Sequence, residues 1–96
     1  MKYFTLFDRK SGAYSPEIFG CRSMPEAVRS VALACDAGKG PVAKFPADFD
    51  LYQIGEFDSN AGVMIPATQQ GPLFIQAVSS IVSEYLIGKA AENVSR

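Results

Sequence analysis

The sequence predicts an α+β domain in the order ββαββα, with two hairpins in one antiparallel sheet and a helix packed on one face. Three observations support this prediction. Two β-rich stretches end in related turn sequences, FDRKSG at 7–12 and FDSNAG at 57–62. A capped amphipathic segment at 23–36 separates the two hairpins. A second amphipathic segment at 72–89 follows them, and we expect it to complete the core or to pair subunits.

The chain length sets the expected number of domains. A chain of 96 residues can bury one hydrophobic core without disulfides or metal, and it is too short for two. We therefore expect a single domain over residues 1–90 and a frayed tail over residues 91–96.

The first hairpin is predicted from aromatic content and turn chemistry. Residues 3–8, YFTLFD, are rich in aromatic and β-branched residues and predict a strand, and RKSG supplies the turn. Pro16 cannot donate to a ladder, so the returning strand should be short or lie at a sheet edge. In both turns an aspartate can accept hydrogen bonds from the loop amides, and Gly12 or Gly62 can adopt the positive φ that closes the turn.

A helix is predicted from Ser23 to about Asp36. Ser23 and Glu26 form a capping-box pattern, and Gly38 is a suitable stop signal. One apolar stripe should pack on the sheet: Met24, Val28, Val31, Ala32 and Cys35. Leu33 lies on the opposite side, where it is either covered by other structure or forms a subunit contact. The GKGP stretch that follows lacks the context of a phosphate loop and is interpreted as a linker.

The second half of the sequence indicates an inner strand, a second hairpin and a long helix. Residues 50–57, DLYQIGEF, have apolar side chains on both faces of a strand, as an inner strand requires. Pro66 ends the returning strand. Polar residues fall on one side of the helix predicted over 72–89, and its apolar side is unusually broad. This helix could serve the core alone, the core and an oligomer contact, or a membrane surface; serine in place of Lys and Arg on its polar face argues against a membrane.

Composition excludes several classes of protein. Apolar runs are too short for a membrane span, and the amino-terminal residues do not form a signal peptide, so we expect no membrane association and a cytosolic protein. Two cysteines and no histidine cannot complete a usual zinc site or a hydrolytic triad. We therefore expect no metal, no cofactor and no enzymatic activity. Cys35 should be a buried apolar residue, and Cys21, in a predicted loop, is reactive if exposed.

The charges are divided unevenly along the chain. Residues 1–44 carry seven Lys or Arg and four acids, whereas residues 45–96 carry two and six. The pI of about 5.2 argues against a strong nonspecific DNA binder and leaves a local basic patch possible. Arg9 and Lys10 are candidates because aromatic residues surround them in the first hairpin, the combination that holds single-stranded nucleic acid. The alternative is that the aromatic residues fill the core and the charges solvate a turn, and this interpretation is favoured because a small sheet with one helix on it needs aromatic residues in its core.

Two pairs of carboxylates have strand-like spacing. Asp48 and Asp50, and likewise Glu56 and Asp58, are two residues apart and could bind a divalent cation or form an acid/base pair. The three aspartates also stand at turns or strand ends, where their side chains commonly accept backbone hydrogen bonds. This second interpretation is favoured.

The segment AKFPADFDLYQIGEFDSNAG, residues 43–62, resembles the small nonstructural protein of gokushovirus-type microviruses, which are single-stranded DNA phages. The matching residues are Lys44, Pro46, Asp48, Phe49, Leu51, Tyr52, Gly55, Phe57, Asp58 and Gly62. The amino-terminal YFTLFDRKSGAY and the capped helix also resemble this family, so the likeness covers roughly residues 3–65. Phe45 and Ala47 stand where the family has a histidine and an acid, and the helix predicted from residue 72 exceeds the family's short tail.

The resemblance implies a nonstructural phage protein that acts in the host cytoplasm during genome replication or packaging. We expect a homodimer that makes weak contacts with single-stranded DNA. The candidate DNA-binding residues are Arg9, Lys10, Arg22, Arg29 and Lys44. The alternative is a homo-oligomeric interaction module that binds a host or viral protein through its carboxy-terminal helix. The candidate interface residues are Leu33, Phe74, Val78, Ile81 and Tyr85.

Overall fold

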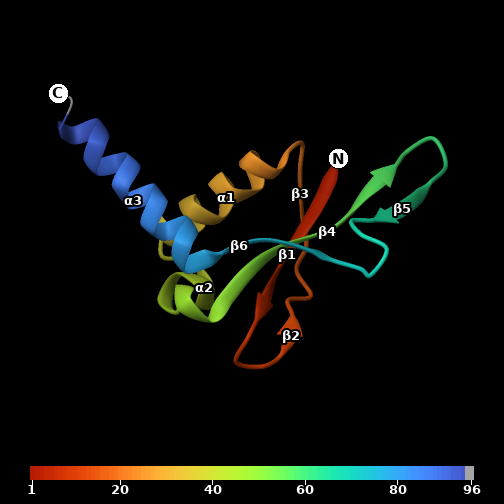
Figure 1. The fold of residues 1–96 in the computed structure, drawn as a ribbon, viewed down its shortest axis with the longest axis horizontal. Helices are drawn as coiled ribbons and strands as arrows, with labels where there is room; N and C mark the ends of the chain where they lie inside the picture. The colour runs from red at the N-terminus through yellow and green to blue at the C-terminus, as the bar shows by residue number, and fades with distance from the viewer. Residues whose placement is uncertain (95–96) are drawn as a thin grey trace.

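The computed structural model describes residues 1–94 (Figure 1). In chain order the elements are β1 (Lys2–Asp8), β2 (Ala13–Tyr14), β3 (Phe19–Cys21), α1 (Met24–Asp36), α2 (Gly40–Lys44), the 3-10 turn η1 (Pro46–Asp48), β4 (Phe49–Asp58), β5 (Val63–Pro66), β6 (Leu73–Ala77) and α3 (Val78–Val94). The predicted α+β class is confirmed. Helix α3 includes residues 91–94 of the expected tail, and residues 95–96 lie outside the described part of the chain.

The sheet is built around the antiparallel pair β1 and β4. Strands β2 and β3 pair with different parts of β1, on the edge that faces away from β4. Strands β5 and β6 pair with different parts of β4, on the edge that faces away from β1. Strand β4 is therefore an inner strand, as predicted. Strand β2 has only two residues and lies at the sheet edge, as Pro16 led us to expect.

Both predicted turns form, and they have the same geometry. The Asp8 carboxylate accepts from two amides of its turn, at 2.9 and 3.4 Å, and Asp58 accepts from two at 3.0 and 3.2 Å. Gly12 and Gly62 have φ of 70° and 71° and donate their amides to the aspartate carbonyls at 2.8 Å in both cases. A residue with a side chain is strained at this φ, so glycine is required by the turn itself.

The helices cover one face of the sheet and build the core on it. Ser23 caps α1 by accepting from the Glu26 amide at 3.4 Å, which confirms the predicted helix start. The buried residues of the core are Phe4, Cys21, Ala27, Val31, Ala32, Leu51, Val78 and Ile81. Of the predicted stripe on α1, Val31 and Ala32 are buried, whereas Met24 is 39% exposed.

The sequence misassigned three segments. Residues 73–77, predicted as the first turns of a long helix, form strand β6, because their backbone pairs with the open edge of β4 and this pairing outweighs the helical periodicity. Cys21 lies in strand β3, where it is buried, and not in a loop, because residues 19–21 pair with β1. Residues 40–41, the second half of the GKGP stretch interpreted as a linker, begin the short helix α2.

The two halves of the chain repeat one connectivity. Each has a long strand, a turn of the FDxxxG form, two partners on one strand edge, and a helix. The hairpin pairs Phe7–Tyr14 and Phe57–Met64 stand fifty residues apart in identical register. The helices share this offset: Val28, Val31, Ala32 and Cys35 in α1 correspond to Val78, Ile81, Val82 and Tyr85 in α3. The echo between the two turns is thus part of a repeat that includes both hairpins and the helices α1 and α3.

None of the helices within residues 1–94 is long and apolar enough to cross a membrane.

Candidate nucleic-acid interface

Four aromatic side chains lie on the sheet face that the helices leave open. In a strand, neighbouring side chains point to opposite faces. Leu6 and Leu51 pack in the core against the helices, so the residues that follow them, Phe7 and Tyr52, point to the other face. Tyr14 and Phe74 pair with Phe7 and Tyr52 across the strands and share their face. We call these four residues, Phe7, Tyr14, Tyr52 and Phe74, the aromatic tetrad.

The rings of the tetrad contact one another edge to face across four strands. The centroids of Phe7 and Tyr14 are 4.9 Å apart, those of Tyr14 and Tyr52 are 5.3 Å apart, and those of Tyr52 and Phe74 are 5.7 Å apart. Such contacts add stability beyond area burial and hold the rings in fixed orientations. Tyr14 is nevertheless 43% exposed and Phe74 is 51% exposed. The tetrad is therefore an ordered aromatic surface that is open to a ligand.

Arg9 joins this surface to the turn of the first hairpin. Its guanidinium lies 3.1 Å from the Asp50 carboxylate and donates to the Ala47 carbonyl, and its amide donates to the Asp48 carbonyl at 2.9 Å. Arg9 therefore clamps the first turn to the start of β4 and has part of its charge neutralised by Asp50. Lys10 is exposed at the tip of the same turn, three residues after Phe7.

Tyr52 occupies the centre of the tetrad, and its surroundings disfavour the phenolate. Burial, with smaller contributions from Tyr14 and Asp50, raises the pKa of the Tyr52 phenol above its ordinary value. The hydroxyl of Tyr52 therefore stays protonated at neutral pH and can donate a hydrogen bond.

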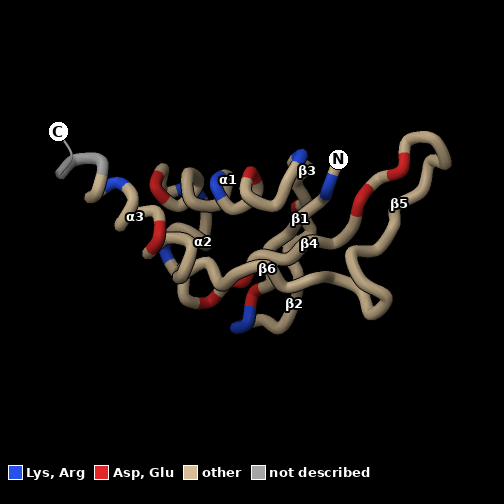
Figure 2. Tube along the Cα trace, turned by 45° about the horizontal axis from the view of Figure 1, so that its top comes forward, with Lys and Arg blue, Asp and Glu red and all other residues tan. Residues whose placement is uncertain are grey.

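The other predicted DNA-binding residues do not converge on this face. Arg22 precedes α1, Arg29 lies on α1, and Lys44 ends α2, so all three belong to the helical layer or its borders. Figure 2 shows the basic positions spread along the molecule and not gathered in one patch. Of the five predicted residues, Arg9 and Lys10 follow Phe7 of the tetrad by two and three residues, and Arg9 is bound to Asp50, which pairs with Phe7.

The five predicted interface residues are also divided by the fold. Val78 and Ile81 are 0% and 1% exposed, so the core covers them and they are not available to a partner. Tyr85 is half-buried and its hydroxyl donates to the Asp36 carboxylate at 3.4 Å. Leu33 is 49% exposed on α1, whereas Phe74 belongs to the tetrad. The residues predicted as one interface therefore lie in four places: the core, the contact with Asp36, the exposed side of α1 and the aromatic tetrad.

Two of the paired carboxylates accept backbone hydrogen bonds or form an ion pair. Asp58 accepts the turn amides described above, and Asp50 is bound to Arg9. Among residues 1–94, acids and cysteines form no group of three that could hold a metal ion.

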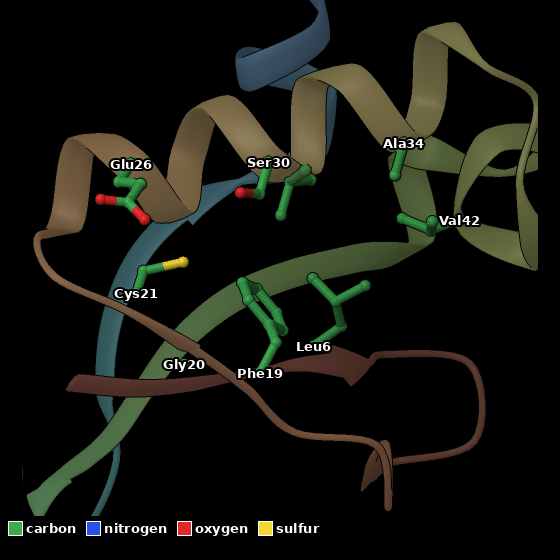
Figure 3. A pocket seen from close by; sticks show the side chains of 9 residues that line it. Leu6, Phe19, Gly20, Cys21, Glu26, Ser30, Ala34 and Val42 are labelled. Carbon is green, nitrogen blue, oxygen red and sulfur yellow. The ribbon is translucent and has the colours of Figure 1, made fainter. Parts of the chain in front are cut away.

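A separate apolar groove lies under α1, between the helix and strands β1 and β3 (Figure 3). Its volume is about 380 Å³, and Leu6, Phe19, Val31, Ala34 and Val42 give it apolar walls. Its polar lining residues are Glu26, Ser30 and Cys21. This groove suits an apolar group and offers little to orient one. Cys35 lies outside the lining of this groove, and burial raises the pKa of its thiol, which makes that cysteine less reactive.

The sequence located half of the tetrad. The sequence groups Tyr3, Phe4, Phe7 and Tyr14 beside the basic turn, and of these Phe4 lies in the core instead. The alternation around Tyr52 predicts a strand and no binding function. Phe74 was placed on a helix because PLFIQAV has apolar residues at helical as well as strand-like spacing. The β-branched and aromatic content of residues 73–75 was the signal that could have indicated a strand.

Comparison with known proteins adds a family. Residues 1–81 match the family model described as Phage ORF5 protein. No curated protein and no solved structure matches the chain. The matched range runs from β1 into the first turn of α3 and so includes the whole aromatic tetrad.

Proposed function

The chain belongs to the Phage ORF5 protein family, and from this premise we propose that it is a non-enzymatic accessory protein of a single-stranded DNA phage of the gokushovirus type. In this proposal it acts in the host cytoplasm and assists genome replication or packaging. It binds single-stranded DNA weakly, and the binding surface is the aromatic tetrad with the adjacent turn.

The tetrad is the observation that supports DNA binding. Aromatic residues of a small sheet are normally explained by the needs of the core, and Phe4 and Phe19 meet that need on the helical side. Tyr14 and Phe74 lie outside the core cluster and remain about half exposed. Unpaired bases stack on rings of this kind, with each stacked base contributing roughly 1–3 kcal/mol. A single strand crossing the sheet would use both exposed rings.

The charges near the tetrad favour a weak complex. Arg9 shares its charge with Asp50, which leaves Lys10 as the principal phosphate contact. The net charge of the chain is −1, so long-range attraction to DNA is small. We expect a shallow salt dependence that corresponds to one or two phosphates, with a slope of about −0.7 per phosphate on a double logarithmic plot.

Fluorescence anisotropy with labelled oligothymidine at low salt tests this proposal. Tyr14→Ala and Phe74→Ala should each weaken binding by roughly 5- to 100-fold, because each removes one stacking surface. Phe45→Ala is the matched control: Phe45 is 58% exposed, joins α2 to η1, and is not part of the tetrad. Its substitution should leave the affinity unchanged.

The same assay separates stacking from charge. Lys10→Ala should weaken binding modestly and reduce the salt slope by about 0.7, since one phosphate contact is lost. The DNA-binding proposal fails if the wild-type protein does not bind at low salt, or if the tetrad variants bind as well as the Phe45→Ala control.

A second candidate function is recognition of a host or viral protein through α3. The observation that favours it is the exposure of Leu86 and Ile87, at 54% and 69%, beyond the part of α3 that packs in the core. A Leu86→Lys, Ile87→Lys double variant tests it in a phage complementation assay. Loss of phage yield with retained folding and DNA affinity supports the second candidate, and full complementation removes it.

A further inference from the structure

The hairpin of β4 and β5 extends beyond the rest of the sheet. Strand β1 ends its pairing with β4 at Lys2, opposite Glu56, so the residues after Glu56 form a two-stranded ribbon (Figure 1). We call residues 57–65 the ribbon. Its exposed apolar side chains are Phe57 at 41%, Val63 at 50%, Met64 at 44% and Ile65 at 51%. Both faces of the ribbon therefore carry exposed apolar side chains: Phe57 and Met64 on one, and Val63 and Ile65, beside Asp58 and Glu56, on the other.

A ribbon of this composition is unfavourable in water by itself. Isolated two-stranded hairpins are marginally stable, and exposed strand edges in monomers usually carry charges such as lysine that prevent pairing. The ribbon contains no Lys or Arg, and β5 consists of Val63, Met64, Ile65 and Pro66. Such an edge is suited to pairing with another chain.

The hydrogen bonds show which groups of β5 point outward. The Phe57 amide donates to the Met1 carbonyl at 3.1 Å, on the side of β4 away from β5. Phe57 and Met64 are therefore a pair without mutual backbone bonds, and the N–H and C=O of Met64 point to the open edge. Pro66 stands two residues later with the same orientation, where its missing N–H removes the next donor.

We propose that the ribbon binds a second copy of this chain, with the two β5 strands antiparallel and the two-fold axis at Met64. The Met64 N–H of each copy donates to the Met64 carbonyl of the other. Because Pro66 has no N–H, the outward N–H groups of the two β5 strands are those of Met64 in each copy. This register pairs both of them. The contact is the same patch on both copies and closes on itself, as in most homodimers.

Charge favours a second copy over nucleic acid on this surface. Residues 45–88 contain no Lys or Arg, Glu56 precedes the ribbon and Asp58 lies within it, so phosphates would be repelled. In the dimer these acids lie on the two β4 strands, three strand spacings or about 14 Å apart. This separation exceeds the Debye length of about 10 Å at 0.1 M salt, so repulsion between the copies is largely screened.

The dimer has a consequence for the open face. A two-fold axis at Met64 perpendicular to the sheet keeps both helical layers on one side and both aromatic tetrads on the other. The ribbon is small compared with the roughly 800 Å² per partner of a standard interface, so the dimer should be weak and reversible.

Sedimentation velocity without DNA, over a wide range of protein concentration, tests the dimer directly. The wild-type protein should shift from monomer to dimer as concentration rises. Met64→Pro should remain monomeric, because it removes the outward N–H while the β4–β5 backbone bonds, which Met64 does not make, are kept. Leu86→Lys is the matched control, a charge placed on an exposed apolar residue of α3, and it should dimerise like the wild type.

A second variant distinguishes loss of dimerisation from a folding defect in Met64→Pro. Ile65→Lys keeps the backbone bonds and places a charge on the ribbon; with a wild-type circular dichroism spectrum it should also be monomeric. A monodisperse monomer of 10.3 kDa at every concentration overturns the proposal. A dimer that survives both ribbon variants, or one that Leu86→Lys abolishes, also overturns it. The Tyr14→Ala variant should still dimerise, so failure of DNA binding and failure of dimerisation are distinguishable.

Discussion

Asp8 and Asp58 stabilise their turns through backbone hydrogen bonds, and this makes a prediction at the scale of single residues. Asp8→Ala and Asp58→Ala should each lower the free energy of unfolding by about 1 kcal/mol, because each removes an acceptor of two turn amides. Urea unfolding of the two variants measures the loss. The corresponding Asp→Asn variants retain a side-chain oxygen and should lose less. Equal losses for alanine and asparagine would show that the negative charge, and not the acceptor, is important.

Tyr52 makes a second prediction at this scale, on pH. Its folded-state pKa is raised above the ordinary value of about 10, so the folded protein retains a proton that the unfolded chain releases. The stability contributed by this group is complete below pH 10 and decreases as pH rises toward the folded pKa. Tyr52→Phe cannot ionise and should lack this alkaline loss.

Ultraviolet titration of the phenolate band and unfolding at alkaline pH check the role of Tyr52 together. The step above the ordinary tyrosine range should disappear in Tyr52→Phe. If that step persists in Tyr52→Phe, it does not come from Tyr52, and the pKa of Tyr52 is not raised in the folded protein.

At the scale of elements, helix α1 leaves space above the sheet. The groove of about 380 Å³ has Ala34 in its wall, a small residue where a larger one would fit. Ala34→Leu should stabilise the fold by about 1–2 kcal/mol, because it buries up to three more carbon atoms at roughly 0.8 kcal/mol each. Differential scanning calorimetry measures this as a higher Tm.

Leu33 supplies the control for the groove on the same helix. It is 49% exposed and outside the groove, so Leu33→Ala should change stability by less than about 0.5 kcal/mol. A lower Tm for Ala34→Leu would mean that the space is too narrow for leucine and that the helix is displaced.

Elements with local signals were predicted well, and those defined by pairing were not. Helix α1 was found from Ser23, Glu26 and its apolar stripe, all of which act within one or two turns. Strand β6 was missed because its apolar residues fit a helix equally well, and only the open edge of β4 decides between the two structures. Strand β3, with three residues, has too little pattern of its own to be recognised.

At the scale of the whole molecule, the fold is one connectivity used twice. The hairpin registers are identical after an offset of fifty residues, and the apolar positions of α1 and α3 follow the same offset. The two hairpins differ in their surroundings. The first turn is clamped to the start of β4 by Arg9, whereas the second hairpin extends beyond β1 as the ribbon. The repeat therefore carries an aromatic surface at one end and an apolar edge at the other.

The sequence by itself determined the turns, the capped helix, the central strands and the α+β class. These depend on interactions between residues close in the chain, such as Asp8 with its turn amides, or on strong alternation, as in β4. The tertiary structure alone decided which face of the sheet is covered. Alternation places Tyr52 opposite Leu51, but both faces are apolar, and only the packing of α1 and α3 buries one and leaves the aromatic tetrad on the other.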